Sequence, residues 1–133
     1  MTNLKKVLLF LMSAYFANTY ITHGWEKFDA DGFWSTAFIE RWGYGLYFMY
    51  FIGVLEFLGG IGILLPKANK YAAFTLAVVM LGAMITRVVF GTSVDDVIWI
   101  AFSMVTLLYL SLAYGMGEEL ERWIGKIKKR SKL

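Results

Sequence analysis

The chain has 133 residues, of which 59% are hydrophobic and only 17% are charged, and a soluble domain of this length could not bury so much apolar surface. The composition therefore predicts a protein of the lipid bilayer. Because the chain has no cysteine and a single histidine, its sequence excludes a disulfide, an iron–sulfur cluster, a thiolate zinc site and bis-histidine haem ligation within one chain.

Four apolar stretches lie at about residues 4–21, 44–65, 71–90 and 97–114. Each is long enough to cross a hydrocarbon core of about 30 Å as a helix. A backbone within lipid must satisfy its own hydrogen bonds, which predicts four helices. The short polar link at 66–70 joins the middle two as an antiparallel hairpin. The predicted fold is all-α: a single domain over 1–133, built as a four-transmembrane-helix antiparallel bundle.

The first stretch ends in a polar cluster. His23 lies three residues before Glu26 and four before Lys27, so these side chains share one side of a helix. A lone histidine in this setting is more often a hydrogen-bonded interface residue than a catalyst. A cleaved signal peptide is the alternative for this stretch, but the polar residues at 15–22 make a poor cleavage region.

The link after the first stretch carries apolar residues at helical spacing, namely Trp34, Ala37, Phe38 and Trp42. Asp31 stands where a helix-capping residue is expected. This pattern predicts a short interfacial helix that covers the outer end of the bundle.

Glu56 lies near the middle of the second stretch. A charge at that depth costs on the order of 3 kcal/mol, so the side chain must face protein or water and not lipid. Gly53 and Gly60 lie on the same side of the helix and allow a close approach there. An acid within the membrane is a candidate binding residue; the alternative is a protonated carboxyl that only holds two helices together.

Arg87 lies about one turn below the outer end of the third stretch, and two interpretations of it remain open. It reaches toward Glu56, with a water or a ligand head group bridging the remaining gap. Alternatively, it extends outward and pairs with Asp95 or Asp96.

These polar residues are expected to converge on a cavity in the outer half of the bundle. A cavity with apolar walls and a few polar groups suits a quinone, a lipid or a peptide segment. No metal site is predicted, because the acids and the histidine lack ligand spacing. The candidate ligand-binding residues are His23, Glu26, Lys27, Glu56, Arg87, Asp95, Asp96 and Trp99, with Trp25, Tyr47 and Phe90 as further walls.

Basic residues fix the expected orientation. Ten of the thirteen lie near the start of the chain, in the 66–70 link, or in the tail at 118–133. By the positive-inside rule both termini are cytoplasmic. The tail also carries an apolar stripe of Leu120, Trp123, Ile124 and Ile127, which suits docking on an anionic leaflet. The simpler interpretation, which the sequence favours, is a topology anchor.

Several motifs in order resemble the DoxX family: Gly24-x-x-Lys27-Phe28, then the glycine-rich run from Glu56 to Leu65, then Tyr71-Ala72-Ala73. The resemblance implies a bacterial inner-membrane protein linked to quinone-dependent oxidoreductases or oxidative-stress complexes. Lys27 and Glu56 match motif positions of the family. Where many members carry a histidine near the end of the third helix, this chain has Arg87, which weakens a borrowed proton-transfer role.

Two functional hypotheses follow. The first is a non-catalytic binding or assembly module, an accessory subunit that contacts other membrane or redox proteins. The second is a quinone-binding subunit of an oxidoreductase, with Glu56 and Arg87 at the head group. The chain owns no redox centre, which favours the first, and no nucleotide or nucleic-acid partner is expected. A transporter is less favoured because no inverted repeat is visible. Gly59-x-x-Gly62 and Gly82 allow a homo-oligomer.

Overall fold

The computed structural model describes residues 2–131, which form helices and, within that range, no strand. The all-α prediction is confirmed. In chain order the elements are α1 (Asn3–Glu26), α2 (Phe33–Ser35), the π-helix η1 (Thr36–Arg41), α3 (Leu46–Gly62), α4 (Asn69–Phe90), α5 (Val94–Ala113) and α6 (Met116–Ser131). Residues 132–133 of the predicted tail lie outside the described residues.

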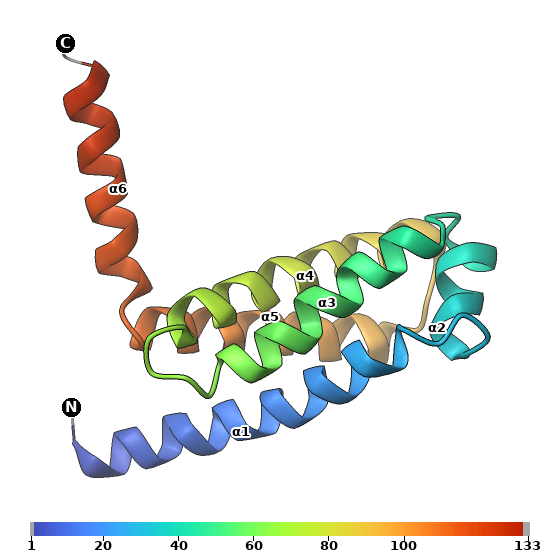
Figure 1. The fold of residues 1–133 in the computed structure, drawn as a ribbon, viewed down its shortest axis with the longest axis horizontal. Coiled ribbons are helices and arrows are strands. Elements are labelled where there is room, and N and C mark those ends of the chain that lie inside the picture. The colour runs from blue at the N-terminus through green and yellow to red at the C-terminus, as the bar shows by residue number, and fades with distance from the viewer. Residues whose placement is uncertain (1, 132–133) are drawn as a thin grey trace.

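Four long helices coincide with the four apolar stretches and run alongside one another along the long axis of the molecule (Figure 1). Of these, α4 and α5 are long and apolar enough to cross a membrane, with 22 and 20 residues. Helix α3 is apolar but has 17 residues, and α1 has 24 residues but is the least apolar of the four. The number of spans therefore stays a prediction.

Glycines allow α1 and α3 to touch backbone to backbone. A Cβ atom added to Gly24 would lie 2.6 Å from the Phe57 nitrogen and 2.7 Å from the Gly53 oxygen. One added to Gly60 would lie 3.1 Å from the Ala17 oxygen. Any larger side chain would force the helices apart, so these glycines bring the end of α1 directly against the middle of α3.

The hydrophobic core fills one half of the bundle. It joins α1 with the end of α3, the first turns of α4 and the second half of α5, and its most deeply buried residues include Ile63, Leu76, Leu107 and Leu110. The Tyr114 hydroxyl ties this end together by hydrogen bonds to the Leu9 carbonyl and to Ser13. Side chains of the opposite half, toward α2, pack less completely and leave a cavity.

The short helix predicted in the link after the first stretch exists as α2 followed by η1. It begins at Phe33 after Gly32, so the expectation that Asp31 caps it is wrong. The Asp31 N–H instead donates to the Asp29 carboxylate at 3.0 Å, because an aspartate two residues earlier can close a local turn. The chain then re-enters the bundle through Gly43 and Gly45, whose positive φ angles suit glycine.

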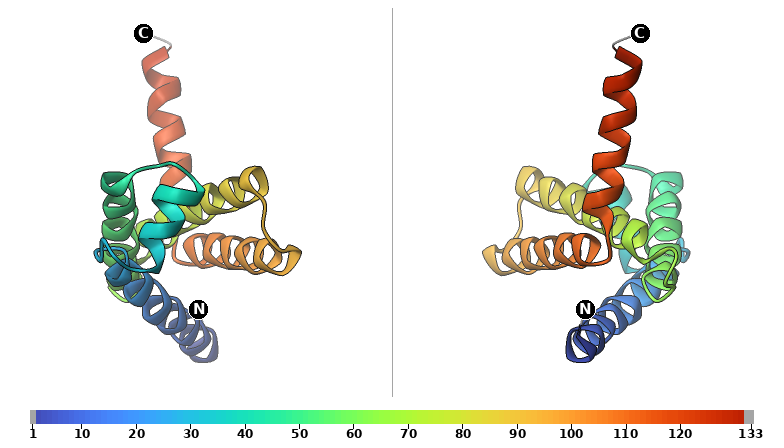
Figure 2. Two further views of the ribbon diagram at one scale, coloured as in Figure 1. Left: turned by 90° about the vertical axis from the view of Figure 1, so that its right-hand side faces the viewer. Right: turned by 90° about the vertical axis from the view of Figure 1, so that its left-hand side faces the viewer.

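Helix α6 leaves the bundle abruptly. Gly115, at φ +110°, ends the preceding helix in a conformation that favours glycine. Helix α6 then runs crosswise to the other long helices, as both end-on views show (Figure 2).

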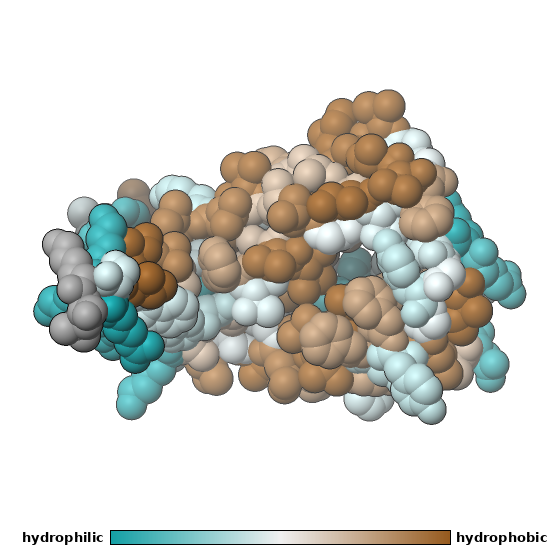
Figure 3. Space-filling model, turned by 90° about the horizontal axis from the view of Figure 1, so that it is seen from above, coloured by the Kyte–Doolittle hydropathy of each residue, from teal (hydrophilic) through white to brown (hydrophobic). Residues whose placement is uncertain are grey.

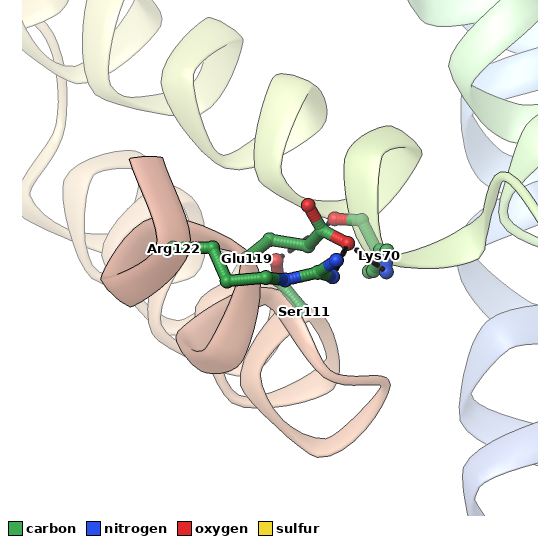
Figure 4. A network of polar contacts seen from close by, with 4 residues as sticks. All are labelled: Lys70, Ser111, Glu119 and Arg122. Atoms are coloured by element: carbon green, nitrogen blue, oxygen red, sulfur yellow. Dashed lines mark hydrogen bonds and ion pairs between the residues drawn. The ribbon is translucent and has the colours of Figure 1, made fainter. Parts of the chain in front are cut away.

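A polar network fixes the base of α6 to the bundle (Figure 4). Lys70 donates to the Glu119 carboxylate at 3.0 Å, the Lys70 carbonyl accepts from Ser111 at 2.8 Å, and Arg122 also pairs with Glu119. The hydrogen bond from Lys70, together with the charge of Arg122, holds the pKa of the Glu119 carboxyl below its usual value.

Candidate ligand-binding site

A buried ion pair joins α1 to α3. Lys27, the residue that caps α1, places its Nζ atom 2.8 Å from a carboxylate oxygen of Glu56, and only 4% and 3% of the two side chains are exposed. The close helix contact at Gly24 and Gly53 makes this possible, because it brings the Lys27 Cβ within 3.0 Å of a Cβ added to Gly53. The acid in the middle of α3 therefore faces protein, paired with a cation.

The segment formed by α2 and η1 covers this pair. The ring of Trp34 lies 3.8 Å from the Lys27 Nζ atom, and its indole N–H donates to Glu26 at 3.1 Å. The His23 ring lies 5.7 Å from the same indole. Lys27 thus has a carboxylate and an aromatic face as partners, two favourable neighbours for a buried cation.

A cavity of about 650 Å³ lies beside the pair. Its walls come from α1, α3, α4, α5 and the α2–η1 segment, and are mostly apolar and aromatic, with Lys27 and Glu56 among the few charged groups. In Figure 3 the apolar surface of the bundle is hollowed in the half away from α6, and hydrophilic surface is visible at the floor of the hollow. Such a volume suits a small molecule with a long apolar part.

Arg87 is the other cation of the cavity wall. Its guanidinium lies 3.7 Å from Asp96, which also accepts a hydrogen bond from Thr92 at 2.9 Å, and faces the ring of Trp42 at 5.9 Å. The Arg87 Nε atom is buried and has no hydrogen-bond partner among residues 2–131. A buried donor left unpaired is costly. Because this atom is almost inaccessible, an acceptor in the cavity would meet the exposed part of the Arg87 side chain, which is 23% exposed.

Some of the predicted site residues line the cavity and others lie outside it. The cavity is lined by His23, Lys27, Glu56, Arg87 and Trp99. Glu26, Asp95 and Asp96 are exposed and stand outside the cavity lining, although Asp96 reaches Arg87 at the rim. Trp25, Tyr47 and Phe90, expected as further walls, do not line it.

Of the two interpretations of Arg87, the structure has the ion pair with Asp96, while Glu56 pairs with Lys27.

Sequence reasoning missed several residues of the site. Trp34, Phe38 and Trp42 line the cavity from the outer segment, and Tyr44 hydrogen-bonds Thr86 across it at 2.7 Å. The four-residue spacing of Trp34, Phe38 and Trp42 was the available signal: it marks one side of a helix, and that side lines the cavity.

Of the comparisons with known proteins, the one with protein families found a match. The family model described as the DoxX-like family matches residues 6–113, which begins within α1, ends with α5 and stops before α6. No match was found among curated proteins or among solved structures. Because the match spans most of the chain, including Lys27, Glu56 and the glycines between α1 and α3, this small membrane protein belongs to the DoxX-like family.

Proposed function

We propose that this protein is a non-catalytic binding module of the bacterial inner membrane, which holds a lipophilic small molecule with a polar head group. In this proposal the four long helices cross the membrane, both termini are cytoplasmic, and the cavity opens in the outer half of the bilayer. The module serves as an accessory subunit of a membrane redox or stress-response complex, as a monomer or a homo-oligomer. Because the four helices cross the bilayer in this proposal, membrane lipid is also a partner of the protein.

One observation carries the proposal: an apolar cavity of about 650 Å³ is lined by the cationic side chain of Arg87. The apolar walls would hold the tail of a ligand, and Arg87 would bind an acceptor on its head group. Lys27 and Glu56 neutralise each other, so they shape the cavity without adding net charge.

The second candidate is a quinone-binding subunit of an oxidoreductase. The aromatic walls favour it, because Trp34, Trp42 and Tyr44 offer flat faces to a ring while Arg87 donates to a carbonyl. Electrons would then have to come from a partner protein, since the sequence contains no cysteine and one histidine.

The test begins with purification of the full chain in mild detergent. Organic extraction and mass spectrometry identify any co-purifying small molecule, and proteomics of the same sample identifies partners. Binding of decylubiquinone and of oleate is then titrated by quenching of tryptophan fluorescence, since three tryptophans line the cavity. Saturable binding of the quinone alone supports the second candidate. Saturable binding of oleate supports the first.

Two variants locate the binding. Ala83 lines the cavity and its neighbour Met84 does not, so Ala83→Phe should abolish binding while Met84→Phe leaves it intact. Arg87→Gln should weaken binding, because the head group loses its charged donor. No extracted molecule and no saturable binding, or equal binding by wild type and Ala83→Phe, would refute the proposal.

A further inference from the structure

Helix α6 has an apolar side that the described bundle leaves uncovered. Leu120, Trp123, Ile124 and Ile127 lie along one side of it, and 47% of Trp123, 51% of Ile124 and 65% of Ile127 is exposed. This side is too apolar to face water without a reason. The match to the family ends at residue 113, before α6 begins.

The direction of α6 suits a helix that lies in a membrane surface. The long helices run together along one axis, and α6 leaves their end crosswise (Figures 1 and 2). If that axis follows the membrane normal, as the proposed function requires, α6 lies parallel to the membrane plane. Figure 3, which shows α6 almost end-on, has hydrophobic atoms on its bundle side and hydrophilic atoms on its other sides. The apolar side thus points the way the acyl chains would lie.

Charge identifies the surface that α6 fits. Its second half carries Lys126, Lys128, Lys129 and Arg130, all exposed, and no acid. Its acids, Glu118, Glu119 and Glu121, stand at the base, where Glu119 is paired with Lys70 and Arg122. An apolar side flanked by basic residues, with a tryptophan among them, is typical of a helix at an anionic lipid interface.

We infer that α6 is a membrane-surface helix that binds anionic phospholipid head groups, on the side of the bilayer where α3 connects to α4. Lys126, Lys128, Lys129 and Arg130 contact the head groups, while Trp123, Ile124 and Ile127 enter the boundary with the acyl chains. The ion pair of Glu119 with Lys70 fixes the angle at which α6 leaves the bundle. The inference rests on the proposed membrane orientation but not on any ligand in the cavity.

The chain has no cysteine, so single labels can be introduced cleanly. Ile124→Cys places a spin label on the apolar side of α6. Gly125→Cys, its matched control, lies on the far side, where an added Cβ meets nothing within 4 Å. The full chain is reconstituted in vesicles of phosphatidylcholine alone or mixed with phosphatidylglycerol, and accessibility of each label to aqueous and lipid-soluble relaxers is measured. In the mixed vesicles we expect residue 124 in the lipid boundary and residue 125 in water.

In the chain labelled at residue 124, Lys126, Lys128, Lys129 and Arg130 are replaced by glutamine. The label should then leave the lipid boundary for water, and the ratio of membrane-bound to free α6 should fall about fivefold for each charge removed. High salt should have the same direction of effect. The inference is overturned if the two labels are equally water-accessible in phosphatidylglycerol vesicles. It is also overturned if residue 124 is protected equally in detergent, with spin–spin broadening that rises with protein concentration, because a second copy of the chain would then cover the apolar side. If the cavity binds neither the quinone nor oleate, the expected positions of the labels at residues 124 and 125 stay the same.

Discussion

Removing one partner of the Lys27–Glu56 pair should destabilise the protein far more than removing both. The Lys27 Nζ atom lies 2.8 Å from a Glu56 carboxylate oxygen, and both side chains are almost fully buried. Each charge is therefore stabilised by the other and not by water. Lys27→Met or Glu56→Gln alone leaves one buried charge without its partner, which costs about 3–5 kcal/mol of unfolding free energy.

The double variant Lys27→Met/Glu56→Gln should be much closer to wild type. Replacing a buried ion pair by neutral side chains of similar volume is often nearly neutral, and here the remaining loss is the contact between Lys27 and the Trp34 ring, about 1–2 kcal/mol. The two single losses together come to about 6–10 kcal/mol and the double loss to about 1–2 kcal/mol, so the two sites should couple by about 4 kcal/mol or more.

The assay is reversible unfolding by dodecyl sulfate in mixed micelles, followed by circular dichroism and tryptophan fluorescence. Lys67→Met, at an exposed lysine in the α3–α4 link, is the matched control and should change the unfolding free energy by about 0.5 kcal/mol or less. If each single variant behaves like this control, or if the two single losses simply add in the double variant, the pair does not hold α1 against α3 and the reasoning fails.

Three further outcomes are expected. Gly24→Ala should lower the melting temperature with a cost of about 1–3 kcal/mol, because its Cβ would overlap the α3 backbone, while Gly82→Ala, where nothing lies within 4 Å, should not destabilise; equal effects would contradict the close contact. The Glu119 carboxyl has a lowered pKa, so its stabilisation is complete above the ordinary carboxyl pKa of about 4 and is lost as the pH falls through the lower folded-state value. Wild type should accordingly melt higher than Glu119→Gln at neutral pH, and a difference that persists unchanged in strong acid would refute the role of Lys70 as the cause. Tyr114→Phe should cost about 1 kcal/mol in the same melting assay through its lost hydrogen bonds to α1, and a variant as stable as wild type would show that these bonds contribute nothing.

The helices themselves were predictable from local sequence. The predicted stretch at 71–90 agrees with α4 at Asn69–Phe90, and 97–114 with α5 at Val94–Ala113. Apolar length and polar breaks determine where a helix begins and ends, and both are visible in one sequence. The first stretch was set too short, because α1 continues as a helix through the polar residues up to Glu26.

The composition of the cavity wall was only half predictable. Glu56 had to face protein because an acid is costly in lipid, and that argument needs no coordinates. The contribution of the outer segment depended on how the link folds back onto the bundle. Trp34 and Trp42 line the cavity because this segment closes over Lys27 and Arg87, which spacing alone did not show.

The sequence by itself determined that the protein is helical and suited to a membrane, and that Glu56 needs a partner within the protein. Only the tertiary structure decided that this partner is Lys27 and that Arg87 reaches Asp96. The physical reason is that partners on different helices are chosen by how far one helix slides and turns against the next. Here the glycine contacts between α1 and α3 set that position, because backbone atoms meet at Gly24 and Gly53 and carry Lys27 to the carboxylate.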